Sequence, residues 1–270
     1  MKHTLYKGDC LEVMDKLIKD GVKVDLILTD PPYGTTACSW DSVIPLDKMW
    51  SKLKQIITNT GCIAIFGSEP FSSNLRMKNI EDYKYDWIWE KGRASGFVHA
   101  KNKPLKAHEN ISIFSKGTTV HKNQSKRRMY YEPIMSEGEP YKKKITQCNT
   151  GKLNHSVSKA NLDFVGTVNE NEGTRYPRSV LKFSMHNVGN IHPTQKPVEL
   201  LEYLIKTYTN ENMTVLDFTF GSNSTGIACL NTYRNYIGIE KDDTYFDLAV
   251  DRTKKHIKDN NIECELEVIE

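Results

Sequence analysis

Strand-sized apolar runs that end in a carboxylate, alternating with segments of helical spacing, restrict the fold of this chain more than any other feature. The run Val24–Thr29 is followed at once by Asp30, and Thr214–Leu216 is followed by Asp217. Apolar strands separated by amphipathic helices are typical of a parallel sheet covered by helices on both faces. The chain is therefore predicted to be an α/β protein with a doubly wound, mostly parallel sheet.

The predicted elements fall into an N-terminal and a C-terminal group. Strands are predicted over residues 3–6, 24–29, 62–66, 85–89, 111–114, 214–216, 236–239 and 263–269, the last as an edge strand. Helices are predicted over residues 11–18, 46–58, 198–208, 225–231 and 244–257. Residues 116–186 are polar, basic and weakly periodic, and the segment is too long for a plain loop. We interpret it as an inserted small domain or a set of ordered loops.

Composition excludes several classes of protein. The 270 residues contain no run of 18 apolar residues, so no transmembrane helix is predicted. The first ten residues are charged and lack an apolar stretch, so no signal peptide is predicted. The six cysteines form no CxxC pair, which disfavours a disulfide framework or a zinc cluster and favours a reducing, cytoplasmic location. No metal site is expected.

Charge is distributed unevenly along the chain. Residues 90–186 hold 18 Lys and Arg against 8 Asp and Glu, whereas the rest of the chain is net acidic. A basic middle segment between acidic flanks indicates contact with a polyanion such as nucleic acid. A merely solvated basic surface is the alternative.

The C-terminal sequence VLDFTFGSNSTGIA, followed by NYIGIE, has the order strand, tight turn, helix, strand, acid. Gly221 allows close backbone approach at the turn, and the next helix presents free N–H groups. Glu240, 19 residues later, is placed to accept hydrogen bonds from a ribose. Since neither a full GxGxxG nor a Walker lysine is present, the pattern favours an adenosine cofactor other than NAD or ATP. An ordinary turn without a ligand is the alternative.

The sequence TDPPYG brings a carboxylate, two prolines and an aromatic ring to the carboxyl end of a strand. Prolines cannot donate N–H groups, so the carbonyls of Asp30 and Pro31 are left to accept hydrogen bonds. Two acceptors beside the flat ring of Tyr33 suit an exocyclic amino group on a heterocycle. The alternative is a proline-rich turn that only ends a core strand.

Together these signals resemble the amino-group DNA methyltransferases that use S-adenosylmethionine. The order is that of the bacterial and phage adenine-N6 enzymes of β type, in which DPPY precedes the cofactor loop. The resemblance covers residues 1–115 and 187–270, and segment 116–186 matches only in position and basic character. The sequences YKGDCLEVM, HENISIFSKG and HPTQKPVELLEYLI also resemble motifs of this family. The resemblance implies a Rossmann-like methyltransferase sheet carrying catalytic and cofactor halves, with 116–186 as an inserted target-recognition region.

The resemblance also implies the site residues. The catalytic residues would be Asp30, Pro31, Pro32 and Tyr33. The carboxylates of Asp9, Glu240 and Asp217 would hold the adenine, ribose and ammonium groups of the cofactor. The complete implied cofactor set is Asp9, Cys10, Asp30, Thr194, Gln195, Lys196, Asp217, Phe220, Gly221, Ser222, Ser224, Thr225 and Glu240.

The implied function is site-specific methylation of adenine N6 in double-stranded DNA, by base flipping and direct in-line transfer from S-adenosylmethionine. Phosphate contacts are expected from two basic runs, Lys126, Arg127 and Arg128, and Lys142, Lys143 and Lys144. The enzyme is expected to act as a monomer or homodimer, with or without a restriction endonuclease partner. Asn223 stands where the family often has glycine, and a modest weakening of cofactor binding is expected there. Cytosine-N4 methylation, RNA methylation and an inactive DNA-binding relative are the alternatives.

Overall fold

The computed structural model describes residues 1–35, 41–120, 125–144, 168–184 and 195–270. The chain divides into a main unit, Met1–Glu132 with Ser179–Glu270, and a second unit, Pro133–Arg178. Among the described residues, no helix combines the length and the apolar character needed to cross a membrane.

The main unit is built on a nine-stranded sheet of order β10-β4-β5-β3-β2-β11-β12-β1-β13. The strands are β1 (Lys2–Lys7), β2 (Val24–Thr29), β3 (Ile57–Gly67), β4 (Tyr83–Ser95), β5 (Lys106–Phe114), β10 (Val180–Phe183), β11 (Thr214–Asp217), β12 (Asn235–Glu240) and β13 (Glu265–Ile269). Only β5 runs antiparallel to its neighbours within this sheet. The predicted α/β fold with a mostly parallel sheet is confirmed, and β13 is the expected edge strand.

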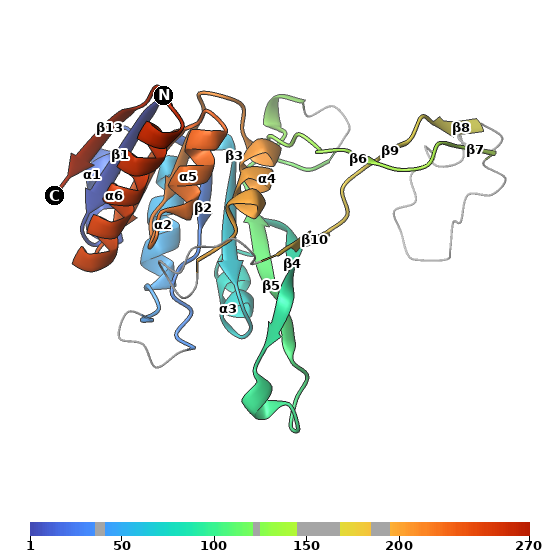
Figure 1. Cartoon of the computed structure of the whole chain (residues 1–270), viewed down its shortest axis with the longest axis horizontal. Helices are drawn as coiled ribbons and strands as arrows, with labels where there is room; N and C mark the ends of the chain where they lie inside the picture. Colours follow the sequence, from blue (N-terminus) through green and yellow to red (C-terminus); the bar gives the residue numbers. More distant parts are fainter. Residues whose placement is uncertain (36–40, 121–124, 145–167, 185–194) are drawn as a thin grey trace. The chain divides into compact units, whose positions relative to one another are not determined.

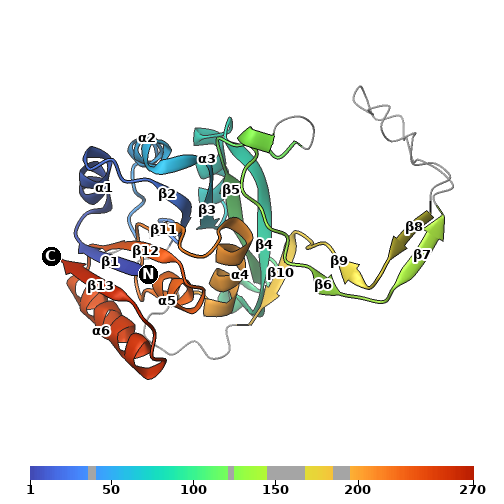
Figure 2. The same ribbon diagram turned by 90° about the horizontal axis from the view of Figure 1, so that it is seen from above.

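Helices cover both faces of the sheet, as Figures 1 and 2 show. The helices are α1 (Cys10–Lys19), α2 (Leu46–Ile56), α3 (Phe71–Lys78), α4 (Val198–Tyr208), α5 (Ser224–Asn231) and α6 (Asp243–Asp259). Side chains alternate along the central strands, so that Ile63 and Ile65 of β3 pack beneath α1, α2 and α3. Ala64 and Phe66 pack on the opposite side, beneath α4, α5 and α6. Burial of apolar side chains on both faces supplies the main stabilisation of such a sheet.

The sequence patterns missed α3, which is short and polar (FSSNLRMK) and lacks a clear apolar stripe. They also underestimated β4 and β5, because the end of β4 is exposed and the first residues of β5 are mostly polar, so neither segment carries an apolar alternation. These segments form a hairpin that extends beyond the sheet and ends in a short 3₁₀ turn, Phe97–His99 (Figure 1).

The second unit is narrower than the segment 116–186 that the sequence set apart. Met129 and Leu181 lie within that segment but are buried in the core of the main unit. The residues next to them therefore belong to the main unit, and the second unit begins at Pro133 and ends at Arg178. The described part of the second unit contains two ribbons. One pairs β6 (Ser136–Glu137) with β9 (Thr174–Arg175), and the other pairs β7 (Tyr141–Lys144) with β8 (Val168–Asn171).

Candidate active site

A cavity of about 560 Å³ lies where β1, β2, β11 and β12 of the main unit end. All four residues of the DPPY motif line it. Every residue predicted to bind the cofactor lines it as well, except Thr194, which lies outside the described residues. Because the carboxyl ends of parallel strands meet at one edge, motifs 187 residues apart in sequence share this cavity.

Asp30 stands at the end of β2, where its carboxylate receives two donors. The Tyr33 hydroxyl donates to Oδ1, and the Lys196 ammonium pairs with Oδ2. The ring of Tyr33 is stacked on Phe71, with centroids 5.2 Å apart and planes inclined by 30°. Pro31 is buried beside them. The motif is therefore held on both sides, by a cation at the carboxylate and by an aromatic ring behind the tyrosine.

Lys196 connects the half-buried Asp30 to a buried carboxylate, that of Glu109. Its Nζ lies 3.5 Å from Oε2 of Glu109, and the other carboxylate oxygen of Glu109 pairs with Lys91. Lys196 and Glu109 are only 7% and 9% exposed. Asp30, Lys196, Glu109 and Lys91 thus form an ionic network of two carboxylates and two ammonium groups. This balance is what permits charges to be buried at all.

The pKa values of Asp30 and Lys196 are both raised, for different reasons. Burial, reinforced by the Glu109 carboxylate, raises the pKa of Asp30 in spite of the opposing charge of Lys196. Burial disfavours the ammonium form of Lys196, but the carboxylates of Asp30 and Glu109 outweigh it and raise the pKa of that lysine. Lys196 therefore stays charged, while Asp30 is a stronger base than an exposed aspartate.

Sequence reasoning missed Lys91 and Glu109, both of which line the cavity. The ammonium of Lys91 lies 5.3 Å from the ring centre of Trp89, and that of Lys196 lies 5.2 Å from the ring centre of Phe66. The one signal in the sequence was a glutamate directly before an apolar strand, in HENISIF. Such a residue is more often solvated, so only the fold identifies it.

Asp217, at the end of β11, is satisfied by hydroxyl and amide donors. The Thr29 hydroxyl donates to Oδ1 over 2.8 Å, and the Thr219 amide donates over 3.2 Å. Burial raises the pKa of Asp217 to about 6, against the effect of these hydrogen bonds. The hydrogen bonds that oppose this shift come from Thr225, Thr29 and Thr219, whereas a cation opposes the shift of Asp30.

The turn after Asp217 is built on left-handed backbone. Gly221 has φ +50° and Asn223 has φ +59°, and Asn223 is the N-cap of α5. Asparagine tolerates this conformation better than most residues, which is why it can replace glycine there. Its buried amide donates to the Thr253 hydroxyl over 2.8 Å, and it is not among the residues that line the cavity.

Two further carboxylates lie on the same side of the cavity. Glu240 accepts backbone N–H bonds from Gly221, Lys241 and Asp242, each 2.9 Å long. Asp9 is the N-cap of α1, and its Oδ1 accepts from the Leu11 amide over 2.9 Å. These contacts use three of about four acceptor positions on Glu240 but only one oxygen of Asp9.

The six residues predicted to contact phosphate lie in both units. Lys126, Arg127 and Arg128 are exposed residues of the main unit. Lys142, Lys143 and Lys144 are exposed on β7 of the second unit, where Lys142 pairs with Glu170. Within the described ranges, no group of three His, Cys, Asp or Glu side chains is arranged to hold a metal ion.

Comparison with known proteins identifies the family. The model of the N6/N4 DNA methylase family matches residues 24–251, which include Asp30 of the DPPY motif and Asp217 of the glycine turn. The chain belongs to the N6/N4 DNA methylase family. It is therefore a DNA methyltransferase that acts on an exocyclic amino group, adenine N6 or cytosine N4.

Several members of this family are similar over most of their length. The Type II methyltransferase M2.LlaDCHI of Lactococcus lactis subsp. cremoris is 41% identical, over 93% of this chain and 89% of its own. M.HinfI of Haemophilus influenzae is 27% identical, over 98% and 71% of the two chains. The structure of M1.HpyAVI in complex with SAM is 25% identical with a TM-score of 0.61, covering 93% of this chain and 98% of its own. PvuII DNA methyltransferase, named as cytosine-N4-specific, shares the fold, with a TM-score of 0.61 at 15% identity over 99% and 95% of the two chains.

Proposed function

We propose that this methylase is the adenine-specific form, which methylates N6 of an adenine extruded from double-stranded DNA, with S-adenosylmethionine as the methyl donor. One observation carries the proposal: a carboxylate, Asp30, lines the cavity beside the buried Pro31 and the ring of Tyr33. A carboxylate at this position favours adenine, because the cytosine-N4 relatives more often carry serine there.

Asp30 and Pro31 would accept the two hydrogens of the amino group. The Asp30 carboxylate has about four acceptor positions, of which Tyr33 and Lys196 use two, so acceptor capacity remains for the base. Accepting these hydrogens directs the nitrogen lone pair out of the ring and stabilises the positive charge that develops on nitrogen. Tyr33, supported from behind by Phe71, would stack on the base.

The ionic network prepares Asp30 for this task. Lys196 holds one carboxylate oxygen in place, and Glu109 and Lys91 hold Lys196 in turn. The raised pKa of Asp30 makes its carboxylate a suitable acceptor for the amino proton once nitrogen is alkylated. From Asp30 the proton would pass to water. Glu109, Lys91 and Lys196 act through Asp30, and we assign them as positioning residues.

The opposite side of the cavity fits the cofactor. S-adenosylmethionine carries an amino group, a ribose diol and an ammonium group as donors, and Asp9, Glu240 and Asp217 line the cavity as acceptors. The volume of about 560 Å³ is within the range of small-molecule sites. Asp9 would hold the adenine, Glu240 the ribose and Asp217 the ammonium. The hydroxyl of Ser222, Ser224 or Thr225 would bind the carboxylate of the cofactor. The remaining predicted contacts would line the site, namely Cys10, Thr194, Gln195, Lys196, Phe220 and Gly221. When bound, the cofactor supplies an electrophilic methyl group.

No cysteine is needed as a nucleophile. Cys10 is the one cysteine among the described residues that lines the cavity, and burial raises its pKa to about 12. Its thiol is therefore protonated at neutral pH and is a weak nucleophile. This supports a mechanism without a covalent enzyme intermediate.

The two basic runs, Lys126–Arg128 and Lys142–Lys144, would contact DNA phosphates, and segment 116–186 would recognise the target sequence. The order of motifs, with Asp30 before Asp217, supports assignment to the permuted β-type group. The relatives M2.LlaDCHI and M.HinfI are named as Type II methyltransferases, which supports a role in a restriction-modification system.

Expression in a host without DNA methylation, followed by sequencing of the modified genome, tests the proposal. We expect a methyl mark on adenine within one short sequence, and digestion to nucleosides should release N6-methyladenine. Release of N4-methylcytosine would instead assign the cytosine-N4 activity. An unmodified genome, together with binding of the purified protein to its cofactor, would indicate an inactive relative.

A further inference from the structure

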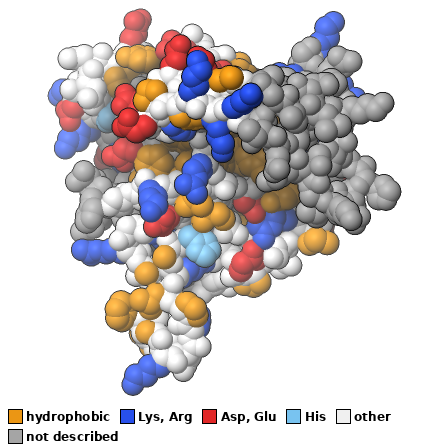
Figure 3. Space-filling view, turned by 90° about the vertical axis from the view of Figure 1, so that its right-hand side faces the viewer, with side chains coloured by type: hydrophobic (Ala, Val, Ile, Leu, Met, Phe, Trp, Pro, Cys, Tyr) orange, Lys and Arg blue, Asp and Glu red, His pale blue; other side chains and the backbone are white. Residues whose placement is uncertain are grey.

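The hairpin formed by the outer halves of β4 and β5 presents apolar side chains to solvent. At its tip, Phe97 is 77% exposed and Val98 is 92% exposed. Figure 3 shows the projecting end of the molecule with hydrophobic side chains around it and a Lys or Arg side chain at its extremity. We call residues 91–106 the arm. Neighbouring apolar side chains exposed at a projecting tip form a candidate contact surface.

The arm is strongly basic. Residues 91–106 contain five Lys or Arg and no Asp or Glu. Lys91 pairs with Glu109, and Lys106 donates to the Ser68 hydroxyl at the base of the arm. Arg93, Lys101 and Lys103 are exposed, and within the described part of the chain they form no ion pair with a carboxylate. An apolar tip flanked by unpaired cations complements a polyanion with an apolar interior.

The arm projects from the edge of the sheet that carries the cavity. β4 is antiparallel to β5, β5 is antiparallel to β3, and β3 is parallel to β2. β4 therefore runs in the same direction as β2, and its continuation leaves the sheet at the edge where Asp30 stands. Trp89 and Lys91 of β4 and Glu109 of β5 line the cavity, so the arm begins at the cavity wall.

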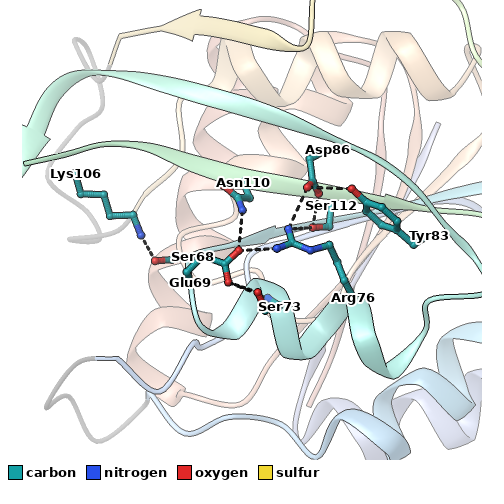
Figure 4. Close-up of polar contacts among 9 residues, drawn as sticks. All are labelled: Ser68, Glu69, Ser73, Arg76, Tyr83, Asp86, Lys106, Asn110 and Ser112. Carbon is teal, nitrogen blue, oxygen red and sulfur yellow. Dashed lines mark hydrogen bonds and ion pairs between the residues drawn. The ribbon is translucent and has the colours of Figure 1, made fainter. Parts of the chain in front are cut away.

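A polar network anchors the base of the arm to α3 (Figure 4). Arg76 of α3 lies between Glu69, at 2.5 Å, and Asp86 of β4, at 3.0 Å. The Ser112 hydroxyl of β5 donates to Asp86 over 2.7 Å, and the Asn110 amide donates to Glu69 over 3.4 Å. The strands β4 and β5 that carry the arm are thereby both connected to α3 and Glu69, next to the start of the arm.

We propose that the arm enters a groove of the duplex beside the target base and that Phe97, with Val98, wedges into the base stack and helps to extrude that base. Arg93, Lys101 and Lys103 would contact the flanking phosphates. The inference rests on the proposed function insofar as that requires an extruded base. Apolar wedges that unstack a base step are an established means by which proteins deform DNA.

The dimensions of the arm suit this role. Phe97 lies six positions after Lys91, which lines the cavity, and an extended chain of that length spans roughly 20 Å. The major groove admits a two-stranded ribbon and is about 8.5 Å deep, so such a tip can reach the base stack. Two side chains are too few for a stable protein interface, which needs about 20 residues on each side.

The test compares methyl transfer to two duplexes that contain the mapped recognition site. In one duplex the target base is paired, and in the other it lies opposite an abasic site and is already unstacked. We expect F97A/V98A to lose roughly tenfold or more of the single-turnover rate on the paired duplex, because extrusion costs a few kcal/mol. The rate on the unpaired target should stay within about twofold of the wild-type rate, because little remains to be unstacked.

Two outcomes would overturn the proposal. An equal loss on both duplexes would show that the tip contributes to general binding or folding, and no loss on either would show that the tip is not engaged. L248A is the matched control, since Leu248 is an exposed apolar residue of α6 that does not line the cavity. The base that the wild-type enzyme modifies reports separately on the proposed adenine specificity.

A second measurement tests the flanking cations. R93Q/K101Q/K103Q should lower the slope of log affinity against log salt concentration by about 2 to 3 units on duplex DNA. K254Q/K255Q/K258Q removes three lysines from α6 and should leave the slope unchanged. An identical slope for the arm variant and the wild type would contradict the phosphate contacts.

Discussion

The two sides of the cavity hold their carboxylates in different ways. On the DPPY side, Asp30 and Glu109 are balanced by the ammonium groups of Lys196 and Lys91. On the glycine-turn side, Asp217 and Glu240 are satisfied by hydroxyl and backbone N–H groups. One side thus depends on the identity of a few charged side chains, and the other depends mainly on the path of the backbone.

This difference has a physical consequence for each side. Removing one member of a buried ionic network leaves an unpaired charge and changes the pKa of its neighbours. Removing one donor from a carboxylate that has several donors changes its properties less, because the other hydrogen bonds remain. We therefore expect substitutions on the DPPY side to affect catalysis strongly, and those on the turn side to affect cofactor affinity moderately.

The largest effect is expected for Asp30→Ala. This variant removes the acceptor for the amino group, so methyl transfer should fall on the order of 1000-fold. Cofactor affinity should change by no more than about threefold, because Asp217, Glu240 and Asp9 remain in place. Transfer of a labelled methyl group and equilibrium binding of the cofactor measure the two quantities. Transfer within about tenfold of the wild-type rate would contradict the role of Asp30.

The two single variants Lys196→Gln and Glu109→Gln should shift the pH profile of kcat in opposite directions. Asp30 must be ionised, so activity is lost as the pH falls through its pKa. The charge of Lys196 lowers this pKa and the charge of Glu109 raises it. Lys196→Gln should move the acidic limb of kcat to higher pH, with roughly 100-fold loss of rate, and Glu109→Gln should move it to lower pH, with roughly tenfold loss.

Shifts of the acidic limb in the same direction for both variants would show that the network acts only on folding. Lys196→Arg is the matched control, because it keeps the positive charge beside Asp30 and should retain the wild-type position of the acidic limb.

A smaller effect is expected on the turn side, where burial raises the pKa of Asp217 to about 6. The ionised form binds an ammonium group, so affinity is full above pH 7 and falls as the pH drops through 6. Cofactor affinity should weaken by about tenfold between pH 7.5 and pH 5. Calorimetric titration at several pH values measures this. The variant Asp217→Asn should bind weakly with no pH dependence in this range, and an unchanged pH dependence would exclude Asp217 as its source.

The smallest effect is expected for Asn223→Gly, which restores the residue frequent in the family. The sequence suggested that Asn223 weakens cofactor binding, but its side chain bonds to Thr253 and does not line the cavity. We therefore expect the cofactor dissociation constant of Asn223→Gly to stay within about twofold of the wild-type value. Loss of that buried hydrogen bond should lower the free energy of unfolding by about 1 kcal/mol. Denaturant unfolding and cofactor titration measure the two quantities. A large gain in affinity would show that asparagine impairs the turn.

The sequence predicted the central sheet well because buried parallel strands carry continuous apolar runs. Val24–Thr29 was predicted with its observed bounds, and so was the helix Val198–Tyr208. The outer halves of β4 and β5 were not predicted, because they are mostly polar and no apolar periodicity marks them. The edge strand β10 was missed as well, since it lies in the polar middle segment and only Leu181 is buried within it.

The sequence alone determined the fold class and the position of both motifs at strand ends, because the side-chain pattern along a strand and the direction of the chain settle these locally. Only the tertiary structure decided that Lys196, 166 residues from Asp30 in sequence, pairs with the carboxylates of both Asp30 and Glu109. It also decided that an exposed hairpin begins at the cavity wall. Ion pairing inside a protein depends on burial and on which strands are neighbours, and neither of these is encoded in the spacing of residues along the chain.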